Sequence, residues 1–213
     1  MDRSQKLVPV HAWPQAMKCA VDALGSWQAL TVISVAMPAT TDRSLARELV
    51  RTALCETLVA YLGPTAASLK LVSCPGQALR LDCHVAQLSV SLSHAPGFSL
   101  AAIGRQGRIG VDVMAADRAV EAMPDWADVA RDYLGPAVTA WLQGLSPVRR
   151  PLAFAQAWTR LEACLKCQAM ALTEWTPAVA LQLAPCSVSA LALPENYRGA
   201  IAIAIATDSE RVA

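Results

Sequence analysis

The chain has 213 residues, of which 54% are hydrophobic and 16% are charged, and its formal net charge is +1. A chain of this length can bury a substantial core as one large domain or as two small lobes, and its near-neutral charge argues against a general nucleic-acid binder. No apolar run reaches the roughly 20 residues needed to span a bilayer. The first residues carry Pro9, His11 and Pro14 instead of an apolar signal core, so we expect a cytoplasmic protein with no membrane contact.

The seven cysteines are an odd number spread without a disulfide framework. We therefore expect them to be reduced and mostly buried. Cys164 and Cys167 have the spacing of half a zinc site, but the sequence offers no second pair to complete a tetrahedron. Metal or redox use of this pair is not expected.

The first half of the chain predicts one long helix among strands. Residues 1–28 show no clear period, with one short helical piece near 14–24, and residues 29–37 form a β-rich run that ends at Pro38. Capping residues 40–42 and the pair Gly63-Pro64 bound a helix over 43–62. Strands are predicted over 68–73, before a turn at 74–76, and over 87–93, where Leu88, Val90 and Leu92 should face inward.

Arg43, Arg47 and Arg51 recur at every fourth position of the helix over 43–62. Such a stripe is compatible with a solvated helix face. It is also what a diphosphate or a 3'-phosphate nucleotide would require, because the guanidinium group is a good partner for phosphate oxygens.

The second half predicts another long helix among strands. Residues 98–103 and 108–113 read as a hairpin around 105–107, followed by a linker over 114–124 and helical pieces over 125–133 and 138–145. The central helix should run over 151–171, with strands over 178–183, 187–193 and 199–206 and a hairpin turn over 195–199. The order strand, helix, strands thus occurs twice. We therefore predict an α+β fold of two pseudo-symmetric lobes, each with a small, mostly antiparallel sheet packed on a long helix.

Two stretches carry candidate chemistry. Glu162 and Lys166 are one helical turn apart beside Trp158, which fits either an ordinary surface ion pair or a functional pair. In the run 110–113, Asp112 is the one residue that breaks an apolar strand.

Together with Ser93-His94 at the end of a strand, Gly110-Val111-Asp112-Val113 and the helix from Trp158 to Lys166 resemble the motifs of the Sfp-type 4'-phosphopantetheinyl transferases. The resemblance covers about residues 29–206. It implies a monomer with an N-terminal lobe over 1–107, a C-terminal lobe over 108–213 and an active site in the cleft between them.

The same resemblance implies Mg²⁺-dependent transfer of 4'-phosphopantetheine from coenzyme A to a serine of an acyl or peptidyl carrier protein in fatty acid, polyketide or non-ribosomal peptide synthesis. Asp112 and Glu162 would hold the metal, and Glu162, Lys166 and Asp112 would be catalytic. The implied coenzyme A contacts are Ser93, His94, Arg43, Ser44, Arg47 and Lys166.

The chain departs from the family pattern at the edge of this site. Met114 replaces a second acid, Gln77 stands where a lysine is common, Leu161 replaces another lysine, and Ala169-Met170-Ala171-Leu172 replaces a glycine-rich sequence. A catalytically inactive homologue that binds coenzyme A or a carrier protein is therefore the alternative. A hydrolase is not expected, because Ser93 lacks the Gly-x-Ser-x-Gly elbow, and the glycines at 104, 107 and 110 read as turn residues and not as a phosphate loop.

Overall fold

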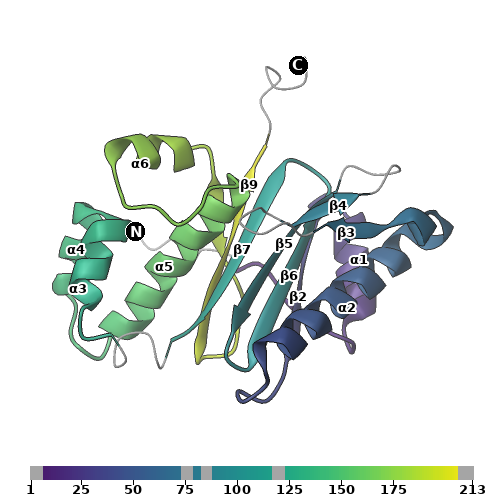
Figure 1. Cartoon of the computed structure of the whole chain (residues 1–213), viewed down its shortest axis with the longest axis horizontal. Coiled ribbons are helices and arrows are strands. Elements are labelled where there is room, and N and C mark those ends of the chain that lie inside the picture. The colour runs from purple at the N-terminus through teal and green to yellow at the C-terminus, as the bar shows by residue number, and fades with distance from the viewer. Residues whose placement is uncertain (1–6, 73–78, 83–87, 117–122, 206–213) are drawn as a thin grey trace.

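The computed structural model describes residues 7–72, 79–82, 88–116 and 123–205. Within these ranges the fold is α+β, with strands in the middle of the molecule and helices at both ends (Figure 1). The strands are β1 (His11–Ala12), β2 (Leu30–Ala36), β3 (Lys70–Val72), β4 (Arg80–Asp82), β5 (Ser89–Ala95), β6 (Phe98–Gly104), β7 (Arg108–Ala115), β8 (Ser187–Ala190) and β9 (Tyr197–Ala204). The helices are α1 (Met17–Gly25), α2 (Arg43–Leu62), α3 (Trp126–Val129), α4 (Pro136–Gln143), α5 (Arg150–Cys167) and α6 (Pro177–Leu183), with a 3-10 helix over Gly63–Ser68 and a π-helical turn over Ala130–Leu134.

A four-stranded sheet in the order β1-β2-β6-β5 packs against α1 and α2. The bounds predicted for α2 are confirmed: the Asp42 side chain caps it by accepting a bond from the Ser44 backbone N–H at 2.7 Å, and Gly63 ends it at a φ of 59°. Val50, Leu54 and Leu58 recur at helical spacing and are completely buried in the core of this half.

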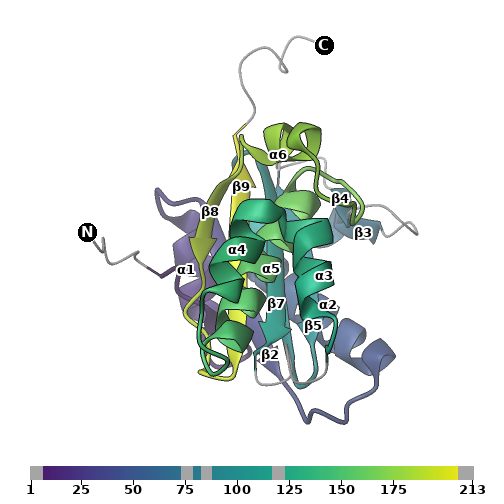
Figure 2. The same cartoon turned by 90° about the vertical axis from the view of Figure 1, so that its left-hand side faces the viewer.

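A three-stranded antiparallel sheet in the order β7-β9-β8 packs against α5. α3 and α4 lie on the outer side of α5, as Figure 2 shows. Gly110 allows the close approach of helix and sheet, because a Cβ at this position would lie 2.0 Å from the Ala163 carbonyl oxygen and 2.4 Å from the Cys167 backbone nitrogen.

The two sheets meet where β5 lies beside β7. Two serine hydroxyls of β5 take the place of backbone acceptors: Ser91 Oγ accepts from the Val111 N–H at 3.0 Å, and Ser93 Oγ accepts from the Val113 N–H at 3.1 Å. The sequence predicted that only the strand face with Leu88, Val90 and Leu92 is turned toward the core. The opposite face is also buried, because Ser91 and Ser93 face the neighbouring sheet.

The strands β6 and β7 were predicted to pair as a hairpin, and that prediction is wrong. Both edges of β6 are already occupied by β2 and β5, so the chain turns at 105–107 and passes into the other sheet, where β7 pairs with β9.

Residues 178–183, predicted as a strand, form the helix α6 instead. Thr176 caps this helix by accepting from the Val179 N–H at 3.1 Å, and Pro177 occupies its first turn. The capping signal outweighs the apolar run. The short strands β1 and β4 were not predicted, and the predicted turn at 74–76 and Gln77 lie outside the described residues.

The helices of the described ranges include none that is both long and apolar enough to cross a membrane.

Candidate active site

Asp112 lies in the middle of β7, with 10% of its side chain exposed. Its Oδ1 atom accepts a hydrogen bond from Ser93 Oγ at 2.7 Å and another from Lys166 Nζ at 2.7 Å. Lys166 also donates to the Val111 carbonyl oxygen at 3.2 Å. One carboxylate oxygen thus joins β5, β7 and α5, which brings together three of the residues predicted for the site.

Glu162 precedes Lys166 by one turn of α5 and is half-buried. Burial raises the pKa of this carboxyl above its usual value, and the negative charge of Asp112 raises it further, while Lys166 acts in the opposite direction. Glu162 is therefore electrostatically coupled to both Asp112 and Lys166. Lys166 forms its ion pair with Asp112 of β7, a residue outside the helix.

The two carboxylates fit the requirements of a Mg²⁺ ion. Asp112 Oδ1 is occupied by its two donors, but Oδ2 makes no hydrogen bond within the described part of the chain. Two carboxylates that repel one another are stabilised by a cation, and Mg²⁺ is commonly held by one or two carboxylates plus phosphate oxygens and water. No group of three or more His, Cys, Asp or Glu residues in the described ranges is arranged to hold a metal ion.

Trp158 supports α5 from the side of α3 and α4. Its ring stacks on Phe154 at a centroid distance of 5.9 Å and meets the edge of Tyr133 at 5.8 Å. The aromatic contacts fix the helix one turn before Glu162. Met114 and Leu161, two of the departures from the family pattern, pack against the same apolar cluster.

His94 lies near the C-terminal end of β5, at the edge of the candidate site. Its Nδ1 atom lies 2.9 Å from Ser99 Oγ of β6. Burial, together with the charges of Arg47, Lys166, Arg43 and Arg51, lowers the pKa of His94 to about 4. The imidazole is therefore neutral at pH 7. Charges from α2 and from the end of α5 thus act on the same side chain.

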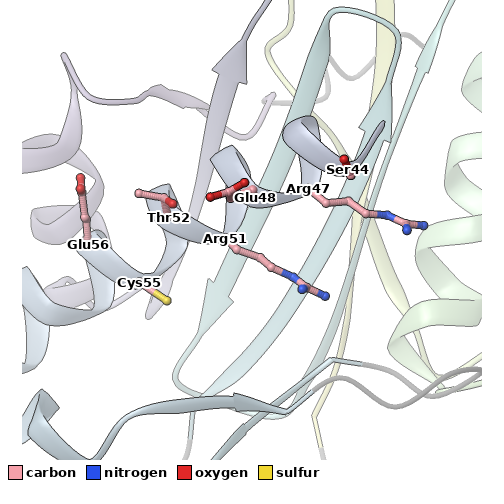
Figure 3. A pocket seen from close by; sticks show the side chains of 7 residues that line it. All are labelled: Ser44, Arg47, Glu48, Arg51, Thr52, Cys55 and Glu56. Carbon is pink, nitrogen blue, oxygen red and sulfur yellow. The ribbon is translucent and has the colours of Figure 1, made fainter. Parts of the chain in front are cut away.

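A groove of about 500 Å³ runs along α2, lined by Ser44, Arg47, Glu48, Arg51, Thr52, Cys55 and Glu56. Arg47 and Arg51 extend from the helix in the same direction, and Glu48 and Glu56 point away from their guanidinium groups (Figure 3). The Ser44 hydroxyl bonds to the capping carboxylate of Asp42. Arg43 and Ser44 were both predicted to contact coenzyme A. The hydroxyl of Ser44 is hydrogen-bonded within the helix cap.

A second cavity of about 250 Å³ adjoins Lys166 and is also lined by Arg80 and Arg108. Arg108 was not singled out from the sequence. The signal was present, because Arg108, Gly110 and Asp112 alternate along β7 and so share one face of the strand. That face is the one that α5 covers.

Cys186, just before β8, packs against the cluster that contains Cys164 and Cys167 of α5. Burial, followed by the neighbouring Cys186, raises the pKa of each α5 thiol to about 12. Both are buried, as the sequence predicted.

The model of the 4'-phosphopantetheinyl transferase superfamily matches residues 108–206, which is just under half of the chain. The matched region contains Asp112, Glu162 and Lys166, whereas Ser93, His94 and α2 precede it. A search of curated proteins returned no match. Over residues 108–206 the chain is therefore similar to the 4'-phosphopantetheinyl transferase superfamily.

Proposed function

We propose that the protein transfers the 4'-phosphopantetheine group of coenzyme A to a serine of an acyl or peptidyl carrier protein. The observation that carries the proposal is the convergence of Ser93 and Lys166 on one carboxylate oxygen of Asp112, with Glu162 electrostatically coupled to Asp112. These four residues come from β5, β7 and α5, and three of them lie in the region that matches the transferase superfamily.

The reaction requires a serine hydroxyl to attack the β-phosphate of coenzyme A, so the site must align two reactants and neutralise phosphate charge. Mg²⁺ held by Asp112 and Glu162 would supply part of that neutralisation at the pyrophosphate. Lys166 is hydrogen-bonded to Asp112 and acts on Glu162 through its charge, and it would neutralise charge on the leaving 3',5'-ADP.

Glu162 is our candidate base for the serine hydroxyl. A carboxylate is a better base when its pKa is raised toward the working pH, and burial and Asp112 both act in that direction. Asp112 is less suited to this role, because its Oδ1 atom already accepts two hydrogen bonds.

The nucleotide end of coenzyme A would lie toward α2. Arg43 and Arg47 act on His94 through their charges, and Arg47 lines the groove along the helix. When the Ser99 hydroxyl donates to Nδ1, the neutral imidazole carries its proton on Nε2 and can donate it to a phosphate oxygen.

The proposal includes the two-lobed arrangement over 1–107 and 108–213, a monomer and a cytoplasmic setting. Each sheet has its own long helix, α2 or α5, which supports this division. Carriers of fatty acid, polyketide and non-ribosomal peptide synthesis are the candidate substrates.

The alternative is an inactive homologue that binds coenzyme A or a carrier, and Met114 in place of an acid favours it. The test is intact-mass spectrometry of several apo carriers after incubation with the protein, coenzyme A and Mg²⁺, beside samples with EDTA. A Mg²⁺-dependent gain of one phosphopantetheine supports the transferase. Coenzyme A binding in calorimetry without any mass gain supports the alternative. The absence of both a mass gain and coenzyme A binding would contradict both proposals.

A further inference from the structure

Three cysteines from two segments of the chain meet at the C-terminal end of α5. Cys164 and Cys167 lie one turn apart on α5, in an apolar cluster with the small residues of β9. Cys186, which comes from the turn before β8, packs against the same cluster. Gln168 Nε2 donates to Cys186 Sγ at 3.3 Å, which fixes this third sulfur in the cluster.

The contacts favour one pairing within the cluster. Cys186 Sγ lies 4.0 Å from the carbonyl oxygen of Cys164. The thiol of Cys167 donates to the Arg108 carbonyl oxygen at 3.2 Å, an interaction that a bond to Cys186 would break. Cys164 makes no such bond to a backbone carbonyl in the described ranges, so it can pair with Cys186 without that loss.

Accessibility gives the order of events. Cys164 is 8% exposed, whereas Cys186 is half-buried and can be reached by a small reagent. A dissolved oxidant would therefore meet Cys186 first, and Cys164 would be the thiol that resolves the oxidised group, slowly because burial raises its pKa.

We propose that Cys186 and Cys164 are a modification site that forms an intramolecular disulfide on exposure to hydrogen peroxide. The Cys186 sulfur attacks one peroxide oxygen, and the O–O bond breaks to give a sulfenic acid and one water. The Cys164 sulfur then displaces the sulfenic hydroxyl, which leaves as the second water when it takes the Cys164 proton. Two thiols have lost two hydrogens and two electrons, and one peroxide has become two waters.

The bond would link the last turns of α5 to the start of β8 and close the loop that contains α6. Closing a loop restricts the unfolded chain, so the oxidised protein should unfold at a higher temperature than the reduced protein. The proposal does not rest on the transferase activity proposed above.

The test is to treat the full chain with hydrogen peroxide, block remaining thiols and map peptides without reduction. We expect a mass lower by two hydrogen atoms, a peptide joining Cys164 to Cys186, and reversal by dithiothreitol. The bond should persist in Cys167→Ser and in Cys19→Ser, which removes an exposed cysteine. It should be lost in Cys164→Ser and Cys186→Ser, and Cys164→Ala replaces the serine variant if that one does not fold.

The proposal is overturned if folded wild-type protein loses no hydrogens over the range of peroxide that oxidises Cys19. It is equally overturned if the bridge joins Cys164 to Cys167, or joins either to any cysteine outside the cluster.

Discussion

Lys166 Nζ lies 2.7 Å from Asp112 Oδ1, across 54 positions of sequence. The pair ties α5 to β7, and with Ser93 it also ties both to β5. Because each partner sits on a regular element, the relative positions of carboxylate and ammonium group are set by the packing of the sheets and not by a loop.

The two buried serines of β5 should differ in their effect on the site. Ser93→Ala removes the acceptor of the Val113 N–H and a donor to Asp112, whereas Ser91→Ala removes only the acceptor of the Val111 N–H. We expect each variant to lose about 1–3 kcal/mol of unfolding free energy in urea titration. Turnover of a carrier protein should fall only in Ser93→Ala. Equal turnover in the two variants would contradict a role of Ser93 in orienting Asp112.

Gly110→Ala should be strongly destabilising. The added methyl group would meet two backbone atoms of α5 at 2.0 and 2.4 Å, so the helix would have to move away from β7. We expect a loss of about 2 kcal/mol or more in urea unfolding. Gly25→Ala is the matched control, because nothing lies within 4 Å of its added Cβ. That variant should be neutral or more stable by about 0.4–1 kcal/mol, and the same loss in both would refute the close contact.

His94 should stay neutral far below its usual range, with a pKa of about 4. Between this value and about 6.5 the unfolded chain binds a proton that the native protein does not, so stability should fall as the pH drops through that range. The imidazole NMR signals measure this directly. Arg47→Gln should raise the pKa of His94, and a bound phosphate ligand should also raise it.

His11 is the internal control for this titration, because burial alone lowers its pKa. Its signal should not respond to Arg47→Gln. A His94 signal that titrates near 6.5 in the folded wild type would contradict the placement of this imidazole among the α2 arginines.

Met114→Glu should reduce the Mg²⁺ requirement. Met114 is two residues beyond Asp112 on β7, so both side chains are on the same face, and an acid there adds a candidate ligand. We expect half-maximal turnover at roughly tenfold lower Mg²⁺. Met114→Gln has nearly the same shape without the charge and should leave the Mg²⁺ dependence as in wild type. An unchanged requirement in the glutamate variant would place Met114 outside the metal site.

Local signals in the sequence predicted the bounds of α2 better than they predicted which strands pair with one another. The cap at Asp42 and the glycine at 63 fixed α2 correctly, because capping depends on neighbouring residues. The partner of β7 depends on which edges other strands have filled, and nothing near residues 98–113 reports that β2 already occupies one edge of β6.

The candidate site shows the same division. Asp112 stood out as the one acid in an apolar strand, and Glu162 and Lys166 as neighbours on a helix, so residue type and period identified them. The burial of Ser91 and the position of Arg108 beside Lys166 follow from how the two sheets and α5 meet, which the alternation of a single strand does not encode.

The rate of holo-carrier formation tests directly whether Asp112, Glu162 and Lys166 catalyse phosphopantetheine transfer. Intact-mass time courses with coenzyme A and Mg²⁺ would compare wild type with Asp112→Asn, Glu162→Gln and Lys166→Met, and Glu195→Gln serves as the control because it alters an exposed acid in the turn before β9. We expect rates at least about 100-fold lower in the three site variants and a wild-type rate in the control. Folded site variants that modify the carrier at the wild-type rate would contradict this expectation.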